Sequence, residues 1–266
     1  MAGTVAWISI APVKGMRMQE LTEVELGPEG ISGDREFFLV GDDGAMVNGK
    51  RIGSLMEIVP EYRDASGELS LTFPDGSVVE GLVEKGEPEE VTFFGNPEIA
   101  RPVSGPFSEA ISAHCGTAVR LMATPEGRPG VDRGQYGTTT LLSTSALERL
   151  ARARVEFGDA DEEEPVDRRR FRMTFGVEGV EAHEEDTWIE GTVAIGTAEV
   201  LVRNHVGRCA VTTRDPERGE VDMRTLHYIR SYREDVKSFE PIPFGVYGIV
   251  TSAGKVRVGD PVVPAK

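Results

Sequence analysis

Cys209 and its neighbours form the segment in which chemistry is easiest to recognise. Arg208 directly precedes this cysteine, and residues 204–219 read Asn-His-Val-Gly-Arg-Cys-Ala-Val-Thr-Thr-Arg-Asp-Pro-Glu-Arg-Gly. A neighbouring cation favours thiolate over thiol, and a thiolate is both a nucleophile and a ligand for soft metals. A cysteine at the start of a strand can also be a small hydrophobic residue, so the Arg-Cys pair alone leaves both interpretations open.

The other sulfur and imidazole groups limit the kinds of site that this chain can build. Cys115 is the only other cysteine, which excludes a disulfide framework, a four-cysteine zinc site and a cysteine-ligated iron–sulfur cluster. The four histidines lack zinc-binding spacing. We expect Cys115 to be a buried structural thiol. His183 and His205 are candidate proton donors, with a hydrogen-bonded structural role as the alternative.

The elements that position these residues are mostly strands. Residues 1–10 are predicted to form a first strand, and alternation of apolar and polar residues predicts two more at 23–26 and 69–73. Turn signals at 41–44 and 74–76 indicate hairpins. Further strands are expected at 192–195, 198–203, 210–213, 245–251 and 256–258.

Three helices are expected among the strands. A short helix is predicted over 106–115, ending at Gly116. A second begins near Ser145, which can form a capping box with Glu148, and a third follows Asp222. The chain is therefore predicted to be mostly β with a few helices, in the α+β class.

Composition excludes some classes of partner. The net charge of the 266 residues is −16, which argues against binding to nucleic acid or to anionic membranes. No apolar run approaches the ~20 residues of a membrane-spanning helix. The first residues are predicted to form a strand rather than a signal peptide, so we expect a cytoplasmic protein.

Several motifs together resemble those of one family, the MOSC proteins, in the branch of the mitochondrial amidoxime-reducing component and bacterial YcbX. The run Arg208-Cys209-x-x-Thr212-Thr213-x-Asp215-Pro216-x-x-Gly219 is similar to the signature of that family. The other matching segments, which follow the family's order, are Pro12-Val13-Lys14, Gly33-Asp34-Arg35, Phe37 to Val40, Asp43-Gly44-x-Met46-Val47, Arg170-Phe171-Arg172, Glu184-Glu185-Asp186-x-Trp188, Ile195-Gly196 and Val258 to Val262. The resemblance covers nearly the whole chain.

The resemblance implies an architecture and a cofactor. It implies an N-terminal β-barrel module over 1–103 and a MOSC β-barrel domain over 104–266. The implied cofactor is the molybdenum cofactor (molybdopterin), with Cys209 as the molybdenum ligand and catalytic residue and with no iron–sulfur cluster in this chain. Soft thiolate suits the metal, and arginine and lysine suit a phosphate. The cofactor-binding residues that the resemblance implies are Lys14, Gly15, Arg35, Tyr136, Gly137, Arg172, Thr174, Gly207, Arg208 and Tyr247.

The chain departs from the family pattern at a few of these positions. Gly15 replaces a serine, Thr174 replaces an asparagine, and Val206 stands where another cysteine is often found. A Thr-Ser pair of the family aligns with Tyr136-Gly137. These differences change the hydrogen bonding around cofactor and substrate, so the substrate range cannot simply be carried over.

The resemblance implies an oxidoreductase that reduces small N-hydroxylated substrates. Its electrons would come from a separate donor protein, a ferredoxin or a flavin reductase. One alternative is a carrier of the cofactor, or a sulfur-transfer protein that uses Cys209. Another is a non-redox accessory protein on the same fold, because a fold alone does not establish a function.

Overall fold

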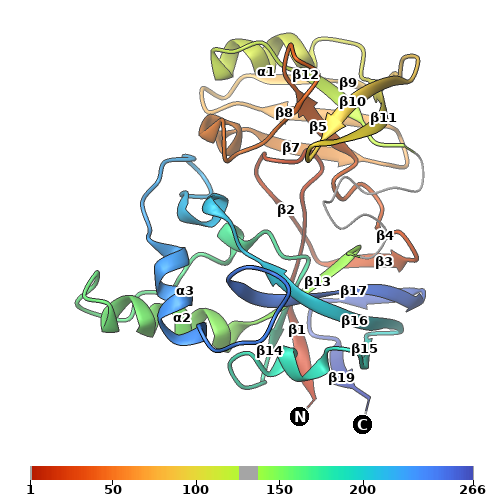
Figure 1. Ribbon diagram of the computed structural model, residues 1–266. Helices are drawn as coiled ribbons and strands as arrows, with labels where there is room; N and C mark the ends of the chain where they lie inside the picture. Colours follow the sequence, from red (N-terminus) through yellow and green to blue (C-terminus); the bar gives the residue numbers. More distant parts are fainter. Residues whose placement is uncertain (1, 126–136, 266) are drawn as a thin grey trace.

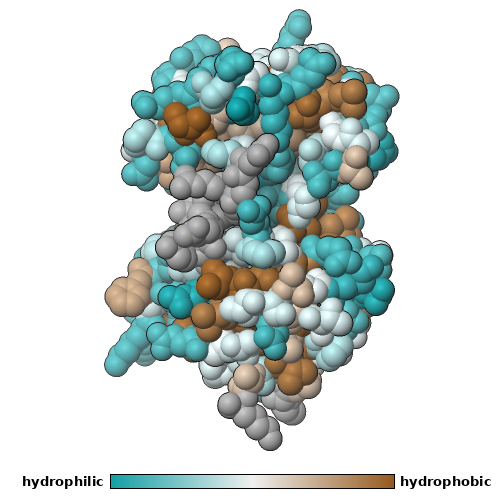
Figure 2. Space-filling view, turned by 90° about the vertical axis from the view of Figure 1, so that its right-hand side faces the viewer, coloured by the Kyte–Doolittle hydropathy of each residue, from teal (hydrophilic) through white to brown (hydrophobic). Residues whose placement is uncertain are grey.

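The computed structural model describes residues 2–125 and 137–265. They form two lobes, one above the other in Figure 1, and Figure 2 shows a narrower waist between them. We call the part from β5 (Phe37–Val40) to β12 (Arg120–Ala123), which includes α1 (Phe107–Cys115), the upper lobe. The other elements make up the lower lobe. Within these described ranges, every helix is too short or too polar to cross a membrane.

A closed β-barrel forms the centre of the lower lobe. Seven strands pair in the order β14-β13-β17-β16-β15-β19-β1, and a further pairing between β1 and β14 closes the ring. Closure lets neighbouring strands satisfy each other's backbone groups all the way round. The bounds are β1 Gly3–Ile10, β13 Thr139–Ser143, β14 Phe175–Glu178, β15 Thr192–Ile195, β16 Ala198–Gly207, β17 Pro243–Ser252 and β19 Pro261–Pro264.

Two hydrophobic clusters hold the lower lobe together. Small branched side chains such as Val177 and Val200 pack around Phe175 in the first. The second includes Phe171 and Phe244, and the apolar faces of α2 (Thr144–Glu156) and α3 (Thr225–Arg233) cover it. β2 (Gln19–Leu21) pairs with β1, and β18 (Gly254–Arg257), β3 (Glu23–Gly27) and β4 (Gly30–Ile31) form a small sheet.

The upper lobe has its own core between two antiparallel sheets. One sheet has the order β10-β11-β12-β5-β6, and the other has the order β7-β8-β9. Phe37, Leu69 and Phe107 are fully buried in the cluster between these elements. The remaining bounds are β6 Met46–Val47, β7 Val59–Arg63, β8 Glu68–Thr72, β9 Val78–Leu82, β10 Glu89–Phe93, β11 Asn96–Pro102 and the 3-10 helix η1 Gly53–Glu57.

The lobes are joined by chain crossings and by a tight contact. The chain passes from β1 towards the upper lobe, returns to β2 in the lower lobe, and enters the upper lobe after β4. The amide of Lys14 donates to Phe37 O at 2.8 Å, and the amide of Arg35 donates to Ala11 O at 2.8 Å. At the seam between the lobes Gly53 packs on Gly219, so closely that a Cβ on either glycine would overlap the backbone of the other. These contacts fix the position of one lobe against the other.

The mostly β, α+β fold is confirmed, as are the first strand, the two hairpins and the three helices. The capping box is wrong: α2 begins at Thr144, and the hydroxyl of Ser145 donates instead to Val180 O at 2.7 Å. The strand expected at 210–213 is also wrong, because these residues form the 3-10 helix η5 (Ala210–Thr213). The division at residue 103 stays a prediction.

Candidate functional site

A cleft of about 280 Å³ lies at the seam between the lobes and contains Cys209. Loops of the upper lobe and strand ends of the lower lobe both contribute to it. Its lining residues are Lys14, Gly15, Arg35, Asn48, Gly49, Lys50, Phe94, Thr140, Phe171, Arg172, Met173, Val206, Gly207, Arg208, Cys209 and Val211. Seven of the eleven predicted site residues therefore meet in one place, although they come from distant parts of the sequence.

The turn after β16 exposes the thiol of Cys209 to the cleft. Cys209 caps η5: its carbonyl accepts the Thr212 amide at 3.1 Å and the Thr212 hydroxyl at 3.1 Å. The hydroxyl of Thr213 donates in the same way to Ala210 O at 2.7 Å. Such back-bonding competes with strand pairing, which explains why the chain turns here instead of continuing as a strand. The Cys209 side chain is left exposed.

The acidic turn that follows Cys209 anchors this segment to the upper lobe. The carboxylate of Asp215 accepts the amides of Glu217 and Arg218 at 2.9 and 2.8 Å and so stabilises the turn. Arg214 donates to Gly219 O at 2.5 Å and across the seam to Lys50 O at 3.2 Å. The segment after β16 therefore contributes Cys209 and Val211 to one wall of the cleft and is tied to the opposite lobe through Arg214.

Arg172 and Arg35 form a pair of cations at the floor of the cleft. Arg172 ends the 3-10 helix η3 (Arg168–Phe171) in the left-handed conformation, at φ 53°, and Arg35 is also left-handed at φ 54°. Arg35 pairs with Asp34 and donates to Arg172 O at 2.8 Å. Two non-glycine residues in this sparsely populated region cost roughly 1–3 kcal/mol each, and such strain is often found at functional sites.

One buried donor at this floor is unpaired. Nη1 of Arg172 donates to Met16 O at 2.7 Å, whereas its Nη2 is buried and has no hydrogen-bond partner among the described residues. Burial, together with the charge of the neighbouring Arg35, lowers the pKa of Arg172 to about 10. An anion in the cleft would satisfy the free N–H groups and offset the repulsion between the two guanidinium groups.

Arg208 lies beneath the cleft and supports its floor. Its buried guanidinium donates to Phe244 O, to Phe171 O at 2.9 Å and to Met173 Sδ at 2.9 Å. It also lies over the ring of Phe171, 5.3 Å from the centroid. These bonds hold β16, β17 and the segment after η3 together, and the predicted contact of Arg208 with a cofactor stays a prediction.

The rim of the cleft is formed by the loop after β1 and by loops of the upper lobe. Gly15 has φ 95°, and a Cβ there would lie 3.1 Å from the Gly49 amide, so the backbone of the two loops can approach closely. Lys14 extends over the ring of Phe94, with Nζ 4.8 Å from its centroid. Asn48 and Lys50 complete this rim. We did not predict Asn48, Gly49, Lys50 or Phe94, which lie in turns without a recognisable motif.

Phe94 is held in an unusual conformation. It is the first loop residue of the β10–β11 hairpin, and with Gly95 it forms a two-residue turn in which φ is 51° and then 85°. Such turns favour asparagine or glycine at this place, and a left-handed non-glycine residue costs roughly 1–2 kcal/mol. The contact with Lys14 is worth about 0.5–1 kcal/mol at an exposed site and does not exceed that cost.

Three predicted residues, Thr174, Tyr247 and Gly137, lie away from the lining. Thr174 lies behind Thr140, whose hydroxyl accepts the Thr174 amide at 2.8 Å, so Thr140 is the residue that reaches the cleft. Tyr247 packs against the Phe244 cluster, and Gly137 is buried before β13. Tyr136 lies outside the described residues. Gly207 does line the cleft, and Glu240 Oε2 and Pro241 pack where its Cβ would be.

The two candidate histidines belong to a buried polar cluster behind the floor. His205 lies 3.4 Å from Asp186 Oδ1, and Arg233 pairs with the other oxygen of Asp186 at 2.8 Å. His183 contacts the Tyr232 hydroxyl at 3.3 Å. Burial, with the charge of Arg233, lowers the pKa of His183 to about 3, so its imidazole is neutral at neutral pH. This favours the structural role for His183.

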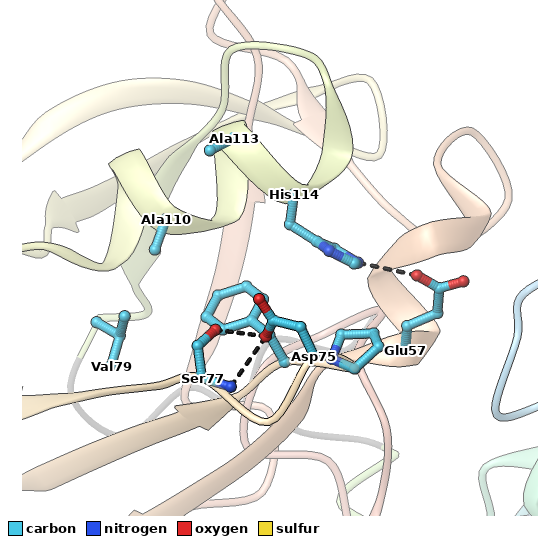
Figure 3. Close-up of a pocket in the computed structure, with 9 residues that line it drawn as sticks. Glu57, Asp75, Ser77, Val79, Ala110, Ala113 and His114 are labelled. Carbon is cyan, nitrogen blue, oxygen red and sulfur yellow. Dashed lines mark hydrogen bonds and ion pairs between the residues drawn. The ribbon is translucent and has the colours of Figure 1, made fainter.

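A second pocket, of about 440 Å³, lies in the upper lobe (Figure 3). His114 points across it and pairs with Glu57 at 3.0 Å, and Asp75 accepts the Ser77 hydroxyl at 2.6 Å. These polar groups already have partners, and Ala110, Ala113 and Val79 give the rest of the wall an apolar surface. Neighbouring Cys115 is half-buried, and burial raises its pKa. We therefore place the candidate site at Cys209.

Comparison with known proteins gives the following similarities. Residues 2–102 match the MOSC N-terminal beta barrel domain, and residues 133–263 match the MOSC domain. The chain is 27% identical to mitochondrial amidoxime reducing component 2 of Bos taurus and 28% identical to that of Homo sapiens. Each alignment covers 98% of this chain and 82% or 83% of the relative.

A further relative has a different name. The chain is 27% identical to a molybdenum cofactor sulfurase of Oryza sativa subsp. japonica, over 85% of this chain and 30% of that protein. The match therefore covers only a part of the sulfurase.

Proposed function

This chain belongs to the MOSC family, and on that premise we propose that it binds the molybdenum cofactor at the Cys209 cleft and reduces N-hydroxylated compounds. The names of its relatives support a role connected with this cofactor. The observation that carries the proposal is the pairing of an exposed thiol with an unpaired, buried guanidinium N–H in one cleft. The first is a soft-metal ligand, and the second is a donor for an anion.

The residues of the cleft fit an anionic group with a soft metal. Lys14, Arg35 and Arg172 bring cations together in a chain whose net charge is −16, and the free N–H of Arg172 lacks an acceptor among the described residues. The backbones of the two loops approach closely at Gly15 and Gly49, which both line the cleft. A hard-cation site is not supported, since the described residues hold no cluster of three or more histidine, cysteine and carboxylate ligands.

The proposal assigns a role in cofactor binding to each of these residues. Cys209 would hold the metal through its thiolate, and Arg172 and Arg35 would bind the phosphate, with Lys14 at the rim. Arg208 would keep the Cys209 turn in register with Phe171 and Phe244. When bound, the cofactor would supply the two-electron chemistry that cleaves an N–O bond. The lobes would shield the substrate from water, and a separate protein would deliver the electrons.

The test combines metal content with turnover. Wild-type chain, Cys209→Ala and the control Cys115→Ala would be produced in a host that makes the cofactor. Molybdenum would be measured by elemental analysis, and reduction of benzamidoxime would be followed with a chemical electron donor. We expect metal near one per chain and turnover in the wild type and in the control, with both lost in Cys209→Ala. Full turnover by Cys209→Ala would overturn the proposal.

A second function is favoured by the exposure of Cys209 and by the similarity to a sulfurase. The Cys209 thiolate could attack the outer sulfur of a donor persulfide, which forms the Cys209 persulfide and releases the donor as a thiol, or the cleft could carry the cofactor to another protein. Mass spectrometry of the intact chain after treatment with a small-molecule persulfide distinguishes these roles. A gain of one sulfur atom at Cys209, with no reduction of N-hydroxylated compounds, would favour the carrier.

A further inference from the structure

The fold alone does not explain why a phenylalanine, Phe94, stands at the tip of the β10–β11 hairpin. A bulky residue occupies a left-handed turn position that suits asparagine, and 44% of its surface is exposed. Its contacts with Lys14 and with the ring of Phe93 do no more than offset the cost of that conformation. When a residue breaks a local rule without a net gain in stability, a functional role is the natural hypothesis.

Backbone and aromatic contacts hold the β10–β11 hairpin in place, and they fix the position of the Phe94 ring. The amide of Thr92 donates to Gly44 O at 2.9 Å, and a β-bridge between Ala45 and Thr92 joins the two edges of the sheet. Phe93 packs edge-on against the buried Phe38, with ring centroids 4.9 Å apart. Phe94 in turn meets Phe93 edge-on at 4.9 Å. A chain of aromatic contacts thus runs from the core to the rim.

The position of Phe94 in the cleft suggests what the ring contacts. Phe94 contributes to the wall from the upper lobe, whereas Cys209 contributes from the lower lobe. Five of the lining residues are cations, and the other aromatic residue among them, Phe171, belongs to the lower lobe, so Phe94 is the aromatic surface that the upper lobe offers there. Aromatic rings stack favourably on planar conjugated groups.

We propose that Phe94 determines substrate choice by stacking on planar, conjugated N-hydroxylated compounds and so favours aromatic amidoximes over aliphatic ones. This inference rests on the proposed function. An offset-stacked pair of rings corresponds to about a threefold to tenfold preference. The preference is expected in KM, because the ring contacts a part of the substrate that does not react.

Two matched substrates test the proposal: benzamidoxime, and acetamidoxime, in which a methyl group replaces the phenyl ring. In the molybdenum-loaded enzyme, Phe94→Asn should raise the KM of benzamidoxime about threefold to tenfold, with kcat retained. The KM of acetamidoxime should change less than twofold. Phe94→Trp should restore the preference for the aromatic substrate. Asparagine suits the turn, so the variant should fold as stably as the wild type.

The control is Ile99→Asn, which removes an exposed apolar side chain from the same hairpin outside the cleft. It should leave both KM values unchanged. Equal changes for the two substrates would overturn the proposal. So would loss of molybdenum from Phe94→Asn, because that result would make Phe94 a support for Lys14.

Failure of the proposed function can be told apart from failure of this inference. If the loaded wild type turns over neither amidoxime, binding of benzamidoxime to the loaded protein is measured by calorimetry. A Kd that rises at least threefold in Phe94→Asn would support the stacking role. An unchanged Kd, or no binding by the wild type, would overturn it.

Discussion

Glu185 offers a direct test of how the buried polar cluster behaves with pH. This residue lies in the 3-10 helix η4 (Glu184–Trp188) and is fully buried. Its Oε1 accepts the Ser143 amide at 3.2 Å, and its Oε2 has no partner in the part of the chain that the structure describes. Burial raises the pKa of Glu185 to about 7, from an ordinary 4.5. The perturbation is Glu185→Gln, which keeps the acceptor and removes the charge.

The raised pKa of Glu185 determines whether this group adds to or subtracts from stability as pH rises. The folded state holds the proton of Glu185 up to about pH 7, whereas the unfolded state releases it near 4.5. The contribution of this group to stability is therefore complete below pH 4.5 and falls as pH rises towards 7. The difference between these two pKa values corresponds to roughly 3 kcal/mol of unfolding free energy.

We therefore expect Glu185→Gln to match the wild type at pH 4.5 and to be about 3 kcal/mol more stable at pH 8. His183 has the opposite effect on the pH dependence of stability. Its lowered pKa makes the unfolding free energy rise with pH between about 3 and 6.5. Only the difference between variant and wild type at each pH therefore isolates Glu185.

The assay is urea-induced unfolding followed by far-ultraviolet circular dichroism at pH 4.5, 6 and 8. Glu181→Gln serves as the control, because this glutamate is exposed on the same segment, and it should give no pH-dependent difference. A Glu185→Gln variant that gains the same stability at pH 4.5 and pH 8, or none at pH 8, would refute the reasoning.

Two further predictions concern the cleft and the seam. Arg172→Met should lower the molybdenum content of the purified protein severalfold, because a charge-assisted hydrogen bond contributes about 1.5–3 kcal/mol. Arg168→Met, which removes an arginine that pairs with Glu20, is the control, and equal metal content in both variants would contradict this role. Gly219→Ala should lower thermal stability by about 1–3 kcal/mol, since its Cβ would overlap the carbonyl of Gly53. Gly259→Ala shares a positive φ but has open space around its Cβ, so calorimetry showing equal losses in the two variants would argue against the seam contact.

Local patterns predicted the elements better than their assembly. Alternation and turn residues located the hairpins at 41–44 and 74–76, because these signals depend on near neighbours. The strand expected at 210–213 failed because the hydroxyls of Thr212 and Thr213 bond back to the turn. The resemblance implied a barrel, but local patterns could not show which strands close it, since β1 pairs with β14 and β19, which lie far along the sequence.

The sequence predicted only part of the candidate site, because motifs are local whereas side-chain directions and contacts between the lobes are not. The motif around Cys209 and the cations Lys14, Arg35 and Arg172 do meet in the cleft. The sequence carries no sign that the guanidinium of Arg208 turns inward to backbone carbonyls. Phe94 was missed because its importance depends on the angle at which a hairpin reaches across from the other lobe, a property of tertiary packing.

The position of β19 in the barrel has a consequence for synthesis on the ribosome. β19 lies between β1 and β15 and is made roughly 250 residues after β1. The barrel therefore cannot close until almost all of its strands have emerged, whereas β5 to β12 are contiguous and can pair as soon as they appear. During this interval β1 presents an apolar edge that is prone to wrong pairing. A nascent chain of this architecture should depend on chaperones that shield strand edges, and this dependence should end abruptly when the last strand is released.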